Sequence, residues 1–101
     1  MLFRSYPLNV WAGSFNGYVY SFTADGKLRH FTAVPGEVTA LKVLSDGSAL
    51  AGTSEGAVMK ISQDGKVTAH AKLAGAVSSL TVLDGRFGVT TRNGEVAEFA
   101  L

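Results

Sequence analysis

The chain has 101 residues, of which 47% are hydrophobic and 17% charged, and its formal net charge at pH 7 is +1. This length and composition predict one folded domain with a buried core and exclude a disordered chain. The nine basic residues are scattered singly, which argues against a nucleic-acid-binding surface, and the lack of cysteine excludes disulfides and thiolate metal sites.

The N-terminal residues contain Arg4 and Pro7 and no long apolar run, so no signal peptide is expected in this chain. No apolar run approaches the roughly 20 residues that a membrane helix needs. We therefore expect neither a membrane nor a nucleic acid as a partner, and we expect a cytoplasmic setting.

The sequence repeats itself at a shift of 39 positions, the distance from Asp25 to Asp64. Turn residues and apolar residues fall on their equivalents together at this shift: Ala12-Gly13 on Ala51-Gly52, Val19 on Val58, Asp25-Gly26-Lys27 on Asp64-Gly65-Lys66, and Leu41 on Leu80. A third copy follows at a shift of 38, where Asp46-Gly47 matches Asp84-Gly85 and Val58 matches Val96. Coincidence of turns and core positions in one register predicts a tandem-repeat protein.

Short apolar runs separated by Asp-Gly and Asn-Gly turns divide each repeat into strands, because glycine tolerates the positive φ of a hairpin turn. In chain order the first repeat predicts strands near Met1–Ser5 and at Leu8–Phe15, Gly17–Thr23 and Lys27–Val34. The second predicts strands at Glu37–Leu44, Ser48–Ser54, Ala57–Ser62 and Lys66–Leu73, and the third at Val77–Leu83, Arg86–Arg92 and Glu95–Ala100. No segment shows sustained helical periodicity, so the predicted fold class is all-β.

Four antiparallel strands in about 40 residues is the size of a β-propeller blade. We predict a single propeller fragment over 1–101, with four-stranded blades at 1–34 and 35–73. A third blade at 74–101 lacks its outer strand.

The residues of these repeats resemble two known propeller families. Gly36 to Leu41, the Ser45-Asp46-Gly47 turn and Leu50 to Val58 are similar to the first three strands of a WD-repeat blade, and Val10 to Leu28 resembles the repeats of quinoprotein-type propellers. The resemblance covers essentially the whole chain and implies the fold. The Gly-His and Trp-Asp pairs of WD repeats are absent, so no structural tetrad is carried over. Quinone-dependent enzymes imply a full ring with a tryptophan docking arrangement, and this chain has one Trp; we expect no enzyme and no cofactor.

The number of blades predicts self-association. Each blade packs both faces of its sheet against neighbours, so we expect apolar faces at the two ends, lined by Phe3, Val10, Phe22 and Leu28 at one end and by Val82, Phe87, Val89 and Phe99 at the other. Large exposed apolar patches are rare on soluble monomers. Since rings contain roughly four to eight blades, we expect a head-to-tail homo-oligomer, with a dimer of about six blades favoured over a trimer of about nine. A designed, evolved or excised fragment of a longer propeller is an alternative origin.

The candidate binding residues lie in loops on one side of the predicted ring and differ between repeats, while the framework around them is kept. They are Phe15, Asn16, Pro35, Glu37, Arg92 and Asn93. Two functions stay open. One is a non-enzymatic scaffold that presents these loops to a protein partner. The other is a glycan or small-molecule binder that uses pockets between blades or the central channel.

Other chemistry-bearing residues have structural explanations. His30 and His70 stand at non-equivalent repeat positions, with no second ligand at a metal spacing. Each of the four Asp-Gly pairs serves a hairpin turn, and no Ser/His/Asp set or nucleophile elbow is present. Trp11 and its neighbouring tyrosines are not repeated in the next blade, so we expect packing rather than a sugar platform. No catalytic or metal site is expected.

Overall fold

The computed structural model describes the backbone of residues 2–6 and 9–101 and the side chains of residues 10–101. These residues form eleven strands and no helix, which confirms the all-β prediction. The strands are β1 (Leu2–Tyr6), β2 (Asn9–Gly13), β3 (Tyr18–Thr23), β4 (Leu28–Ala33), β5 (Val38–Val43), β6 (Ala49–Thr53), β7 (Ala57–Ile61), β8 (Val67–Lys72), β9 (Val77–Leu83), β10 (Arg86–Thr91) and β11 (Val96–Ala100). With no helix in this part of the chain, none is long and apolar enough to cross a membrane. Met1, Leu8 and the side chain of Phe3, which the sequence analysis assigned, lie outside the described residues.

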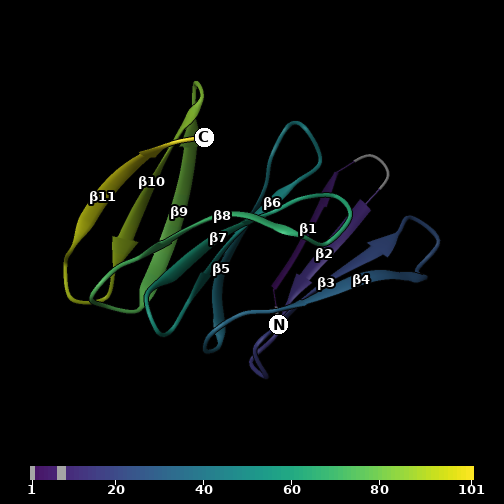
Figure 1. Cartoon of the computed structure of the whole chain (residues 1–101), viewed down its shortest axis with the longest axis horizontal. Coiled ribbons are helices and arrows are strands. Elements are labelled where there is room, and N and C mark those ends of the chain that lie inside the picture. The colour runs from purple at the N-terminus through teal and green to yellow at the C-terminus, as the bar shows by residue number, and fades with distance from the viewer. Residues whose placement is uncertain (1, 7–8) are drawn as a thin grey trace.

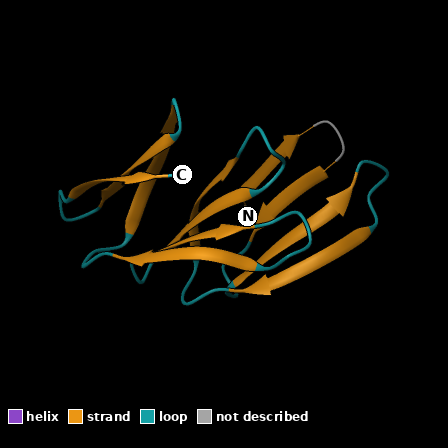
Figure 2. Cartoon of the chain, turned by 45° about the horizontal axis from the view of Figure 1, so that its top comes forward, coloured by secondary structure: helices purple, strands orange, loops and turns teal. Residues whose placement is uncertain are grey.

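The strands form three antiparallel sheets that follow one another along the chain. Sheet 1 has the order β1-β2-β3-β4, sheet 2 the order β5-β6-β7-β8, and sheet 3 the order β9-β10-β11. Figures 1 and 2 show them side by side like a fan, with sheet 1 at one end and sheet 3 at the other. The first strand of each sheet lies innermost, since β5 contacts β1 and β2 on one side and β9 on the other.

The described strands begin and end within a few residues of their predicted bounds, and the differences arise in the turns. The strand predicted at Leu8–Phe15 ends at Gly13, because Ser14 already belongs to a turn in which its N–H donates to the carbonyl of Tyr18 at 3.0 Å. Strands β3, β6 and β10 likewise give up one or two predicted residues to neighbouring turns.

A hydroxyl residue that the sequence analysis did not single out organises most of these turns. The N–H of Ala57 donates to Thr53 Oγ1 at 3.2 Å, and the N–H of Lys66 donates to Ser62 Oγ at 3.2 Å. Three residues before the turn glycines Gly56 and Gly65, such a hydroxyl binds a backbone N–H that the turn would otherwise leave unpaired. Gly65 itself has φ +87°, a conformation that residues with a side chain rarely adopt.

Two layers of apolar side chains hold the three sheets together. Between sheets 1 and 2, Trp11 and Val19 pack against residues of sheet 2: Leu41, Ala49, Ala51 and Ile61. Between sheets 2 and 3, Leu50 and Val58 pack against residues of sheet 3: Val77, Phe87 and Val89, with Leu80, Val82 and Phe99 partly buried beside them. Every inner sheet face is therefore covered by a neighbouring sheet.

This packing corrects the predicted end face of sheet 3. Val82, Phe87, Val89 and Phe99 do not face outward; they pack on sheet 2. Side chains alternate between the two faces of a strand, and the more apolar face of sheet 3 is the one turned inward. The alternation alone does not say which face points to the neighbour, so the prediction chose the wrong one.

The inner strand of each following sheet lies directly on the backbone of the preceding one. A Cβ placed on Gly52 would lie 2.4 Å from Val77 Cγ1, and one on Gly13 would lie 2.3 Å from Val38 Cγ1. Hydrogen bonds cross the same junctions: the N–H of Val38 donates to Ser14 O at 3.1 Å, and Thr39 Oγ1 donates to Val77 O at 2.6 Å. Glycine at these two equivalent positions is what allows the sheets to approach.

Candidate interaction surfaces

The outward face of sheet 3 carries apolar side chains that are buried at the same repeat position in sheet 2. Leu83 is 69% exposed, whereas its equivalent Leu44 is 5% exposed and packs toward sheet 3. Val96 is 77% exposed, whereas its equivalent Val58 is 1% exposed. The repeat therefore presents at this end the side chains that elsewhere contact a following sheet.

A hollow of about 410 Å³ lies beside Leu83 on the outward face of sheet 3. Gly88 stands at its floor, where the equivalent positions in sheets 1 and 2 are Trp11 and Leu50. Arg86 Nη1 and Glu98 Oε1 form an exposed ion pair at 2.7 Å on the same face. This face therefore combines apolar, polar and charged side chains around Gly88, which has no side chain of its own.

The outward face of sheet 1 is aromatic. Tyr18, Tyr20 and Phe22 alternate along β3 with Val19 and Ser21 and so point away from sheet 2. The centroids of neighbouring rings are 6.1 Å apart for Tyr18 and Tyr20 and 6.3 Å apart for Tyr20 and Phe22. Phe22 also pairs in register with Val10, which places these two predicted end-face residues on the outward side.

The loops on one side of the fan bring three of the six predicted binding residues together. Phe15, Asn16 and Glu37 line an open trough of about 560 Å³, together with two residues that the prediction omitted, Ser54 and Glu55. Phe15 is 67% exposed. One backbone bond and one bond to a side chain fix the walls, since Ser54 N donates to Glu37 O at 2.8 Å and Glu37 N donates to Ser54 Oγ at 2.9 Å.

The other three predicted binding residues lie outside this trough. Pro35 is exposed on the β4–β5 loop beside it, and Arg92 and Asn93 are exposed on the β10–β11 loop of sheet 3. Ser54 and Glu55 were detectable from the sequence, because they occupy the loop one repeat after Phe15 and Asn16.

His30, Asp46 and Asp64 contact neighbouring residues that hold turns of the fold in place. A Cβ on Gly65 would lie 2.8 Å from the Cβ of His30, so this histidine packs against the β7–β8 turn. The described residues contain no group of three or more His, Cys, Asp or Glu side chains that could hold a metal ion. The hydrogen bond from the Ser62 hydroxyl lowers the pKa of Asp64, and that from the Ser48 hydroxyl, at 2.5 Å, lowers the pKa of Asp46.

A small apolar cavity of about 130 Å³ lies between sheets 2 and 3. Its walls include Leu50, Val58, Ala71, Phe87 and Phe99. Pockets that bury a drug-sized ligand have about 300–1,000 Å³. The cavity is therefore too small for a drug-sized ligand, and its volume matches that of a side chain or a backbone turn.

Comparison with solved structures places this geometry among known folds. The chain superposes on the computationally designed Ika4 protein with a TM-score of 0.85 at 17% identity, covering 98% of this chain and 64% of that chain. For the designed Ika8 protein the TM-score is 0.83 at 16% identity, with 97% of this chain and 32% of that chain covered. For BamB from Moraxella catarrhalis the TM-score is 0.77 at 21% identity, with coverages of 98% and 31%.

These similar structures are β-propellers, and the fold of this chain is that of β-propeller blades. No protein-family model matches the sequence, and no curated protein matches it either. At such low identities the likeness shows the fold alone. The chain spans 64% of the length of Ika4 and about a third of the length of the other two proteins.

Proposed function

We propose that this chain is a non-enzymatic propeller scaffold whose end sheets associate head to tail with a second copy to close a ring of about six blades. The observation that carries the proposal is the contrast between equivalent positions: Val58 is 1% exposed and Val96 77%, and Leu44 is 5% exposed and Leu83 69%. A following sheet covers these positions inside the chain. The sheet that would cover them on sheet 3 is the outward face of sheet 1 of another copy.

The sizes of the side chains on the two end faces support this pairing. Inside the chain, the large Trp11 meets Ala49 and Ala51 on the facing sheet. On the outward face of sheet 3 the same position is Gly88, with a hollow above it. The aromatic face of sheet 1 supplies bulk in return, because Tyr20 and Phe22 stand where sheet 2 has Met59 and Ile61. A large side chain would therefore again meet a small residue, but at this interface the large side chains come from sheet 1 and the small residue comes from sheet 3.

The two end faces are also compatible in polarity. The Tyr18 and Tyr20 hydroxyls would meet a face that carries Thr81, Thr90 and the Arg86–Glu98 pair. Buried hydroxyls need hydrogen-bond partners, and this face offers both donors and acceptors. Two copies, each with three sheets, give a ring within the known range of roughly four to eight blades.

Solution mass tests the proposal. Sedimentation velocity of the unmodified chain should give about 21 kDa, twice its 10.6 kDa. Val96→Lys combined with Leu83→Lys should return the mass to that of one chain, because each buries a charge in the proposed interface. The matched control is Val67→Lys on β8, which is partly exposed and away from both end faces; it should leave the larger mass unchanged. A monomer in the unmodified chain, or dissociation in the control alone, would contradict the proposal.

We also propose that the loop trough binds a protein partner. The exposed aromatic ring of Phe15 can anchor a partner, and the carboxylates of Glu37 and Glu55 would form part of a polar rim around it. The likeness of the fold to designed propellers is consistent with a scaffold role. Phe15→Ser and Glu37→Gln should weaken capture of a purified partner while the solution mass stays constant. The same loss from Asp84→Asn, on a turn outside the trough, would refute this assignment.

A further inference from the structure

The outer edge of β11 differs from the corresponding edges of the other sheets. In sheets 1 and 2 the third strand pairs on both sides, with β4 against β3 and β8 against β7. β11 pairs with β10 on one side, and among the described residues no strand pairs with its other edge. Figure 1 shows β11 at the outer margin of the fan.

The register of β11 identifies the backbone groups that this edge offers. Leu101 N donates to Gly85 O at 2.9 Å, and Thr91 N donates to Glu95 O at 3.0 Å, so the odd-numbered residues bond to β10. The N–H and C=O groups of Val96, Glu98 and Ala100 therefore point to the open edge, because an antiparallel strand alternates its bonding direction. Ser62, the repeat equivalent of Ala100, uses its N–H to bond Lys66 O at 2.8 Å.

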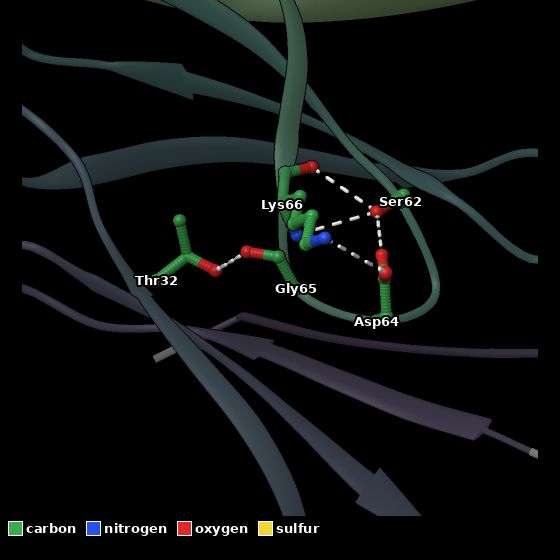
Figure 3. Close-up of polar contacts among 5 residues, drawn as sticks. All are labelled: Thr32, Ser62, Asp64, Gly65 and Lys66. Atoms are coloured by element: carbon green, nitrogen blue, oxygen red, sulfur yellow. Dashed lines mark hydrogen bonds and ion pairs between the residues drawn. The ribbon is translucent and has the colours of Figure 1, made fainter.

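The junction between sheets 1 and 2 shows what occupies the corresponding place. There the Ser62–Lys66 turn, which leads into β8, lies against the outer strand of the preceding sheet: Thr32 Oγ1 donates to Gly65 O at 2.7 Å. Figure 3 shows this bond beside the contacts that Ser62 makes with Asp64 and Lys66. The turn closes the outer end of the packing layer between the two sheets.

At the junction between sheets 2 and 3 this place is the 130 Å³ cavity. Ala69 and Ala71 line it at the repeat positions of His30 and Thr32, and Phe99 and Ala100 line the facing side. Phe99 stacks on Phe87 with ring centroids 5.3 Å apart, which gives the cavity a firm apolar wall. The cavity therefore adjoins the same strand whose edge is open.

We propose that the edge of β11 and this cavity form a strand-acceptor site for an extended peptide segment. The occupant has the chemistry that the chain itself places after Ser62 and Gln63 in sheet 2: an Asp-Gly-Lys turn followed by a strand of alternating small and polar residues. Its backbone pairs with Val96, Glu98 and Ala100, and its turn enters the cavity beside Ala71. This is strand addition to a sheet edge, in which backbone bonds give affinity and a pocket gives selectivity. The site lies at the rim and does not depend on ring closure.

A peptide with the sequence of residues 64–73 is the probe, added to the full ¹⁵N-labelled chain and followed by NMR. The proposal expects saturable shifts of the amides of Val96, Glu98 and Ala100. Glu98→Pro should abolish them, since it removes the central donor of the edge while proline is tolerated on an edge strand. Glu98→Ala is the matched control: it removes the same exposed ion pair with Arg86 and keeps the N–H, so binding should persist.

A gain of affinity gives a second, independent readout. Ala71→Thr restores the hydroxyl that Thr32 uses at the first junction, and one added hydrogen bond should tighten peptide binding roughly two- to tenfold. The proposal is overturned if a scrambled peptide binds as well, if Glu98→Pro binds like Glu98→Ala, or if shifts centre on β7, which would mean exchange with β8. Sedimentation of the peptide-free chain reports on ring closure separately, so failure of either proposal is visible without the other.

Discussion

Gly52 is the position where a single added carbon tests the packing of one sheet on the next. Gly52→Ala places a Cβ 2.4 Å from Val77 Cγ1 and 2.8 Å from Val77 Cβ. The second atom is fixed to the backbone of β9, so a change of rotamer does not relieve the contact. Sheets 2 and 3 must separate locally, or β6 must shift.

Overpacking of this kind costs typically 1–3 kcal/mol. For a domain of this size each kcal/mol lowers Tm by roughly 4–8 °C. Val77→Ala removes the nearer atom and leaves the 2.8 Å contact, so the double variant should lose less stability than the sum of the two single variants.

The assay is urea unfolding followed by circular dichroism, with thermal unfolding as a second measure. Gly88→Ala is the control, because β10 is the equivalent strand and a Cβ there meets only Ala97 O, at 3.9 Å. Since Gly88 lies in the proposed ring interface, both substitutions are compared in the Leu83→Lys/Val96→Lys chain. That substitution should be neutral or stabilise the fold by up to about 1 kcal/mol. Equal effects of Gly52→Ala and Gly88→Ala, or strict additivity with Val77→Ala, would refute the close approach of the sheets.

Three further predictions concern buried groups and turns. Ser21→Ala should stabilise the fold by about 1–3 kcal/mol in urea unfolding, because the hydroxyl is fully buried and has no hydrogen-bond partner among the described residues; a loss of stability would contradict this. The bond from Ser48 holds the pKa of Asp46 below its ordinary value of 3.8. The ionised Asp46 therefore stabilises the fold above about pH 4, and this contribution is lost as pH falls through the lowered pKa. Tm should decline less steeply with acid in Asp46→Asn than in the unmodified chain, and parallel declines would be inconsistent with the bond. Leu50→Ala should cost about 2–5 kcal/mol in the same unfolding assay, since Leu50 lies in the layer between sheets 2 and 3, and a cost below 1 kcal/mol would show that the layer is not a packed core.

The strands were predictable because the types of the residues in the turns determine where each strand begins and ends. Asp64-Gly65 and its equivalents mark hairpins through glycine conformation, and the repeat places one strand pattern three times in register. Turn hydroxyls such as Thr53 carried a sequence signal as well, a Ser or Thr at a fixed distance before the turn glycine. That signal becomes meaningful only when its bond to the backbone is seen.

The surfaces were harder to predict, because they depend on direction in three dimensions. Alternation along β10 distinguishes Phe87 from Gly88 but does not tell which of them faces sheet 2. The trough unites Phe15 with Glu37 because the β2–β3 and β4–β5 loops meet, while Arg92 lies one sheet further along. The cavity beside β11 has no sequence signature, since it arises from Ala69 and Ala71 standing where the first repeat has His30 and Thr32.

The mass of the chain in solution tests the proposed ring most directly, because the proposal has a second copy cover the exposed Val96 and Leu83. Sedimentation velocity over a range of micromolar concentrations should show a species of about 21 kDa, twice the 10.6 kDa chain. A single 10.6 kDa species at every concentration would contradict head-to-tail closure.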